Sequence, residues 1–104
     1  MKNKTLESSQ KLLQALASTV GQLQSDEEVL RFLMDLCTPA ELQAMADRWQ
    51  VAQMLEAGRT YRDIQSETGV SVTTVGRVAR AMTFGDSGYQ LALQKIKRSN
   101  NGND

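Results

Sequence analysis

The 104-residue sequence contains no histidine, and it has a single cysteine and a single proline. Histidine is the commonest general base and the commonest metal ligand, so its absence argues against acid–base enzymes and zinc sites. The lone Cys37 cannot close an internal disulfide, and its apolar surroundings predict a reduced, half-buried thiol. We therefore expect neither an enzyme nor a metal-binding protein.

Long hydrophobic runs are also missing. No apolar segment approaches the ~20 residues that a membrane span needs, and residues 1–5 lack the apolar stretch of a signal peptide. We expect a cytoplasmic protein that does not enter membranes. A chain of this length suits one domain, here predicted to span residues 1–104, with disordered ends at about residues 1–5 and 99–104.

The charges are balanced overall but unevenly distributed. The formal net charge of zero argues at first against a nucleic-acid partner. Residues 1–58 carry five Lys or Arg against eight Asp or Glu, whereas residues 59–104 carry seven against four. The second half is thus net positive by three. This distribution indicates an acidic half that serves as scaffold, followed by a basic half that carries the function.

Apolar spacing and capping residues predict an all-α chain. Apolar residues recur at spacings of three, four and seven in the first helix, and Ser, Thr and Gly mark the starts and stops of the others. We find no strand pattern. The predicted helices cover 6–23, 26–36, 39 to the stop at Gly58, 61–68, 72–82 and 89–98, and residues 84–88 are predicted to form a turn.

The third predicted helix carries apolar residues on more than one face. A helix with this pattern is usually buried on several sides, and so small a chain has few elements of its own to bury it. A second subunit is the interpretation that we favour. The alternative is a compact monomer in which the first helix folds back.

Residues 60–82 have the pattern of a helix-turn-helix. Such a motif needs a tight turn containing Gly, here Gly69-Val70-Ser71, and apolar residues that lock one helix against the other. Ile64, Val75 and Val78 occur where that lock is required, together with Val70 in the turn. Gln65 departs from the pattern, because the position after Ile64 is usually small.

The second helix of this motif has two distinct faces at ~100° per residue. Val75, Val78, Ala79 and Met82 fall on the face expected to point inward. The opposite face contains no acidic residue, whereas an ordinary solvated face would usually include Glu, Lys or Gln. It consists of Thr73, Arg77 and Arg80, flanked by Thr74 and Gly76.

Hydroxyls, guanidiniums and a glycine on one face suit close approach to DNA. We expect Arg62 to meet the DNA backbone or an outer base, and Val72 to touch a thymine methyl. Arg77 and Arg80 are competent for either phosphates or bases. The predicted DNA-contacting residues are Thr60, Arg62, Gln65, Ser71, Val72, Thr73, Thr74, Gly76, Arg77 and Arg80.

Several of these segments together resemble the Trp repressor superfamily, in particular its YerC/YecD-type members. The matching segments are 36–42, 46–48, Gly58, 60–64, 68–71, 74–75, 77–78 and 84–86. The resemblance implies a Trp-repressor-like fold, an intertwined homodimer of six-helix subunits whose two helix-turn-helix units project as reading heads.

The resemblance also implies a position for a small-molecule corepressor, because the Trp repressor holds tryptophan between two arginines. The matching arginines are Arg48 and Arg77, with Thr38 and Thr74 near them. Val78 replaces the glycine that follows the second arginine, and its side chain would intrude on the indole slot. We therefore expect tryptophan not to bind, and we expect the arginines to pair with Asp47, Glu41 or a phosphate.

We expect, on these grounds, a sequence-specific transcriptional regulator, a repressor, that binds a roughly palindromic operator in double-stranded DNA as a homodimer. The reading heads of such a dimer would lie one DNA turn apart, ~34 Å. The alternative is a protein-interaction module on the same scaffold that no longer binds DNA. Overall neutrality and Gln65 favour that alternative.

Overall fold

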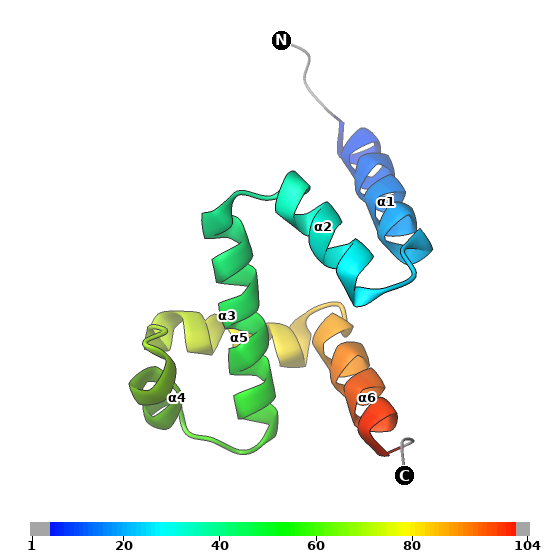
Figure 1. The fold of residues 1–104 in the computed structure, drawn as a ribbon. Helices are drawn as coiled ribbons and strands as arrows, with labels where there is room; N and C mark the ends of the chain where they lie inside the picture. Colours follow the sequence, from blue (N-terminus) through cyan, green and yellow to red (C-terminus); the bar gives the residue numbers. More distant parts are fainter. Residues whose placement is uncertain (1–4, 102–104) are drawn as a thin grey trace. The chain divides into compact units, whose positions relative to one another are not determined.

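The computed structural model describes residues 5–101, and all regular structure among them is helical (Figure 1). The all-α prediction is confirmed, with boundaries within a few residues of those expected. The helices are α1 (Leu6–Gln22), α2 (Asp26–Leu36), α3 (Pro39–Glu56), α4 (Tyr61–Thr68), α5 (Val72–Phe84) and α6 (Gly88–Asn101).

The ends of the chain were predicted to be disordered. Residues 1–4 and 102–104 lie outside the described residues. Thr5 caps α1 by accepting a hydrogen bond from the backbone N–H of Ser8 at 3.0 Å. Residues 99–101 belong to α6, so this part of the predicted tail is helical.

The chain divides into two compact units, one ending at Pro39 and the other beginning at Ala40. The first unit holds α1 and α2, and none of their residues is buried. Cys37, which follows α2, is a half-buried free thiol, as predicted. The second unit holds α3 to α6 and contains the buried core.

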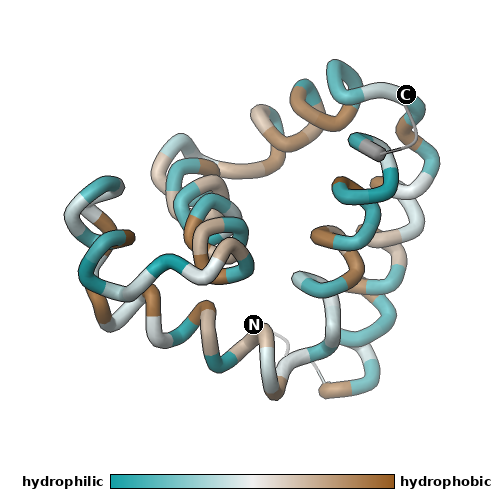
Figure 2. Tube along the Cα trace, turned by 90° about the horizontal axis from the view of Figure 1, so that it is seen from below, coloured by the Kyte–Doolittle hydropathy of each residue, from teal (hydrophilic) through white to brown (hydrophobic). Residues whose placement is uncertain are grey.

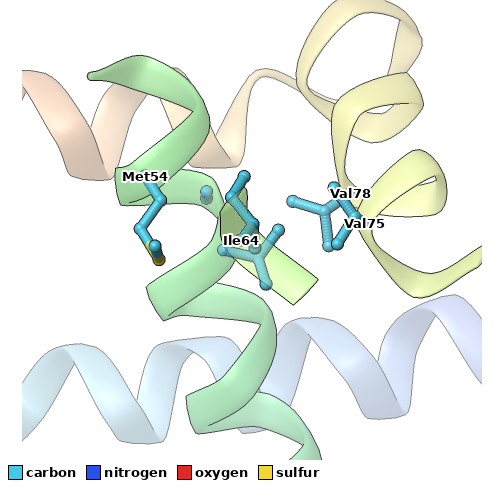
Figure 3. Packing of buried hydrophobic residues seen from close by; sticks show 6 residues of the cluster. Met54, Ile64, Val75 and Val78 are labelled. Carbon is cyan, nitrogen blue, oxygen red and sulfur yellow. The ribbon is translucent and has the colours of Figure 1, made fainter. Parts of the chain in front are cut away.

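The core of the second unit lies where α3, α4 and α5 meet. Ile64 and Val75 are 0% exposed and Val78 is 1% exposed, which confirms the predicted lock between the two helices of the motif. Val51 of α3 is buried against them in the same cluster. Figure 3 shows Ile64 between Met54 on α3 and the two valines on α5.

Helix α6 packs against this core through aromatic rings and one polar contact. Trp49 of α3 and Tyr89 of α6 stack with ring centroids 6.5 Å apart and planes inclined by 4°. The side-chain amide of Gln90 donates a hydrogen bond to the carbonyl oxygen of Met82. Hydrophobic and hydrophilic residues are interspersed along the trace (Figure 2).

Helix α5 ends later than predicted. We expected it to stop near Met82 and Phe84 to begin a turn, but Phe84 is the last helical residue. The stop is at Gly85, whose N–H donates to the carbonyl oxygen of Ala81 at 2.9 Å. A Cβ at Gly85 would lie 2.4 Å from that oxygen, so the close approach requires glycine.

No helix among the described residues is long and apolar enough to cross a membrane. Within the same residues, no three His, Cys, Asp or Glu side chains gather where they could hold a metal ion.

Replacing Gly69 with alanine is expected to lower the free energy of unfolding by about 1–2 kcal/mol. Gly69 ends α4 in the left-handed conformation, with φ of 77°, where a Cβ meets the backbone unfavourably. The control is Gly76→Ala inside α5, where a Cβ would make only an ordinary 3.9 Å contact with the ring of Tyr61. That variant should gain roughly 0.5–1 kcal/mol. Urea denaturation followed by circular dichroism measures both, and equal effects would contradict the expectation.

Candidate nucleic-acid interface

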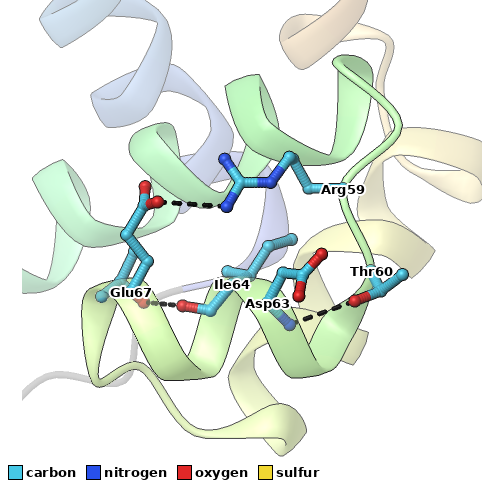
Figure 4. Close-up of polar contacts among 6 residues, drawn as sticks. Arg59, Thr60, Asp63, Ile64 and Glu67 are labelled. Atoms are coloured by element: carbon cyan, nitrogen blue, oxygen red, sulfur yellow. Dashed lines mark hydrogen bonds and ion pairs between the residues drawn. The ribbon is translucent and has the colours of Figure 1, made fainter.

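Capping hydrogen bonds fix the two helices of the helix-turn-helix at their starts, and Figure 4 shows the cap of α4, between Thr60 and Asp63. Thr60 Oγ1 accepts a hydrogen bond from the N–H of Asp63 at 3.1 Å, which begins α4. Ser71 Oγ accepts one from the N–H of Thr74 at 3.2 Å, which begins α5. Such caps satisfy N–H groups that have no partner within the helix. The direction of α5 is thus set by short-range contacts as well as by its buried valines.

The turn between the two helices is held by Thr68. Its hydroxyl donates to the carbonyl oxygen of Ile64 at 2.6 Å and accepts from the N–H of Val70 at 3.0 Å. The N–H of Gly69 donates to the carbonyl oxygen of Gln65 at 2.8 Å. These hydrogen bonds hold the short turn through which α4 leads into α5.

The outer face of α5 is accessible, as the sequence predicted. Thr73, Arg77 and Arg80 are all exposed, and Thr74 and Gly76 on the flanks are half-buried. Ala79 and Met82, expected to point inward, are half-buried. The predicted two faces of α5 are therefore present in the folded chain.

The remaining predicted contact residues also reach solvent. Arg62 and Gln65 are exposed on α4, and Val72 is 45% exposed at the start of α5. Thr60 and Ser71 are exposed as well, but each hydroxyl oxygen already serves as a helix cap. The Thr60 hydroxyl can still donate its proton to a phosphate oxygen while its oxygen accepts from the backbone. The Ser71 hydroxyl donates to Thr74 Oγ1 at 3.1 Å, so it would have to give up that contact to reach a phosphate.

Positive charge on this face is not neutralised by neighbouring acids. Helix α5 contains no acidic residue. Arg59, before α4, pairs with Glu67 at 3.1 Å (Figure 4). Arg62, Arg77 and Arg80 take part in none of the ion pairs found among residues 5–101. Their guanidinium groups are available for an anionic partner.

The residues of the expected corepressor site differ in how far each is exposed. Arg48 on α3 and Arg77 on α5 are exposed, and Thr74 is half-buried next to the cap of α5. Val78 is 1% exposed and belongs to the buried core cluster. Thr38 belongs to the first unit. The expectation about tryptophan stays a prediction.

One exposed residue next to this face was missed by the sequence reasoning. Phe84 was assigned to a turn, yet it lies on α5 and is 75% exposed. Its ring lies under the guanidinium carbon of Arg80, 5.4 Å from the ring centroid. The spacing of Thr73, Arg77, Arg80 and Phe84 is four, three and four residues, which places all four along one stripe of a helix. That spacing was a signal in the sequence.

Comparisons with known proteins agree with this geometry. A model of the Trp repressor protein family matches residues 11–97. The uncharacterized protein YerC of Bacillus subtilis strain 168 is 42% identical over 89 residues, which cover 86% of each chain.

Two solved structures are similar to this chain over nine-tenths of its length. A TrpR-like protein from Eubacterium eligens has 36% identity and a TM-score of 0.71, with 90% of this chain and 92% of that chain covered. A candidate Trp repressor from Staphylococcus aureus has 32% identity and a TM-score of 0.79, with 90% and 96% covered. The chain belongs to the Trp repressor family, a family of regulators and not of enzymes.

Proposed function

We propose that this protein is a transcriptional regulator that binds operator DNA as a homodimer, with α5 as the reading helix. The observation that carries the proposal is the division of α5 into two faces. Val75 and Val78 are buried against α3 and α4, and Thr73, Arg77 and Arg80 are exposed on the other side. A reading helix needs this arrangement, because its base contacts must be rigidly held from behind.

The chemistry of the exposed face suits DNA more than a protein partner. Guanidiniums form paired hydrogen bonds with guanine and with phosphate, and threonine hydroxyls meet either bases or phosphates. Gly76 lies on the flank of this face and adds no side chain that would hold α5 away from a groove. Arg62, in the first turn of α4, is available for the DNA backbone.

The homodimer is supported by the first unit, which lacks a core of its own. Neither α1 nor α2 has a buried residue, although both carry large apolar side chains. Among these, Leu13 is 66% exposed, Leu30 is 56% exposed and Met34 is 62% exposed. Apolar surface on this scale marks an interface in a soluble protein. A second copy of the chain, as the family resemblance implies, offers the same apolar faces in return.

The test of DNA binding is a selection from random duplexes followed by titration at several salt concentrations. We expect the selected duplex to be roughly palindromic, with half-sites ~34 Å apart, and to bind at least ~10³-fold more tightly than random DNA. Six guanidiniums per dimer, from Arg62, Arg77 and Arg80, would give a slope of log K against log salt near −5 if all six meet phosphates. Equal binding of all duplexes, without dependence on salt, would refute the proposal.

Replacing Leu13 with glutamate is expected to shift the protein from dimer to monomer. A charge at a buried apolar contact has no partner and costs several kcal/mol in the associated state. The control is Ser18→Glu, because residue 18 lies on the opposite side of α1 from Leu13 and Leu16 at 100° per residue. Sedimentation velocity over a range of concentrations measures both variants. A dimer of unchanged stability in the Leu13 variant would exclude this face from the interface.

A further inference from the structure

The exposed stripe of α5 ends on an aromatic ring. Phe84 is 75% exposed, although a phenylalanine gains nothing from contact with water. Long side chains on a helix lean toward its N-terminus, so this ring extends back toward the residue four positions earlier. That residue is Arg80, whose guanidinium carbon lies 5.4 Å from the ring centroid.

Stacking on a ring holds a guanidinium differently from an ion pair. In an ion pair the carboxylate occupies the N–H groups, but a ring meets the flat face of the guanidinium and leaves the N–H groups at its edge available. Arg80 has no partner among the ion pairs found in residues 5–101. Phe84 therefore restricts the position of the Arg80 guanidinium and leaves its N–H groups available for hydrogen bonds.

The same ring borders a hollow shared with the second arginine of the face. Arg77, Arg80 and Phe84 line a hollow of about 300 Å³, together with Ala81 and Gly85. No acidic side chain lines it. A phosphate or a base edge that enters this hollow meets two guanidiniums, one of which is already held in place.

We propose that Phe84 is a positioning residue for DNA recognition, whose ring holds the guanidinium of Arg80 in a DNA-competent orientation. The inference rests on the proposed DNA-binding function, and it adds a residue that does not itself need to touch DNA. Ordering a long side chain before binding reduces the entropy lost on binding, which is how such a ring raises affinity.

The test compares Phe84→Leu, Phe84→Tyr, Arg80→Ala and the double variant Phe84→Leu/Arg80→Ala on a selected duplex. Phe84→Leu is expected to weaken binding about 4- to 25-fold per dimer, since each of two stacked pairs is worth about 2- to 5-fold. Its salt slope should equal that of the parent, because no charge is lost. Phe84→Tyr, which keeps the ring, should bind within about 2-fold of the parent.

The double variant decides whether the ring acts through the arginine. In the Arg80→Ala background, Phe84→Leu should change affinity by less than about 2-fold. Equal losses in both backgrounds would overturn the inference, as would a loss in Phe84→Tyr matching that in Phe84→Leu. If Phe84→Leu instead dissociates the dimer, and binding recovers at protein concentrations that restore it, the ring serves the subunit interface and the inference fails.

A measurement without DNA separates this inference from the proposed function. The ring current of Phe84 should shift the side-chain protons of Arg80 upfield in the NMR spectrum of the free protein, and Phe84→Leu should abolish the shift. An unshifted Arg80 would overturn the inference while DNA binding by the parent stands. A parent that binds no duplex would remove the proposed function, and the positioning role with it.

Discussion

Replacing both Arg77 and Arg80 with alanine is expected to weaken binding to a selected duplex by at least 100-fold. A guanidinium that contacts a base or a phosphate contributes about 1–3 kcal/mol, and a tenfold change in affinity corresponds to about 1.4 kcal/mol. Both side chains are exposed on α5, so their removal leaves the core unchanged. Fluorescence anisotropy titrations at several salt concentrations measure the loss and the change in salt slope.

The matched control removes the same charge from another helix. Lys95→Ala/Lys97→Ala takes two positive charges from α6, and Lys97 is involved only in an exposed pair with Glu56 at 3.8 Å. This variant should bind within a few-fold of the parent. If both double variants weaken binding equally, the effect comes from net charge alone and α5 is not the reading helix.

A conservative version of the same change separates base contacts from phosphate contacts. In Arg77→Lys/Arg80→Lys the charge remains, but the paired hydrogen-bond geometry of guanidinium is lost. If the arginines contact phosphates, this variant should retain most of its affinity and the salt slope of the parent. If they read guanines, it should lose discrimination between selected and random duplexes while keeping its binding to random DNA.

The sequence was most informative where local chemistry determines structure. Ser and Thr were predicted to mark the starts of helices, and Thr60 and Ser71 do so by accepting capping hydrogen bonds. Gly58 and Gly69 were predicted to follow the ends of helices, and both have the left-handed conformation that favours glycine there, with φ of 82° and 77°. Each of these features depends on residues within four positions in the chain, so periodicity and capping rules suffice to locate them.

Features that depend on distant residues were harder to predict. The stack of Trp49 on Tyr89 joins helices forty residues apart in the chain, and no local pattern indicates it. The placing of Val78 beside a ligand depends on the family resemblance and stays a prediction, whereas its burial was predicted from its position on the inward face of the helix. A helical wheel gives the direction in which a side chain points, but it does not identify the residue of another helix that the side chain contacts.

The end of α5 shows how a boundary error can hide a functional residue. Gly85 followed by Asp86-Ser87-Gly88 is rich in turn-forming residues, and this composition favoured a turn beginning at Phe84. The helix in fact uses Gly85 as its C-terminal cap. Extending the spacing of Thr73, Arg77 and Arg80 by four residues would have placed Phe84 on the same stripe.

Replacing Ile64 with alanine is expected to destabilise the second unit by about 2–5 kcal/mol. Ile64 is 0% exposed and lies between α3 and α5 (Figure 3), so truncation removes buried methyl groups and leaves a cavity that the surrounding helices fill only in part. Small domains have only about 5–15 kcal/mol of stability in total, so the reading helix would lose much of its support. Urea denaturation at one fixed protein concentration measures the change, because the stability of a dimer depends on concentration.

Two further variants fix the interpretation of the Ile64 result. Ile64→Val removes a single methylene and should cost about 0.5–1.5 kcal/mol, whereas Ser66→Ala on the exposed side of α4 should stay within about 0.5 kcal/mol of the parent. DNA affinity should fall with stability in the Ile64 series and should be unaffected in the Ser66 variant. A loss below about 1 kcal/mol in the free energy of unfolding of Ile64→Ala would mean that the surrounding helices close the cavity completely. Another contact would then have to hold α5 with its threonine and arginines toward DNA.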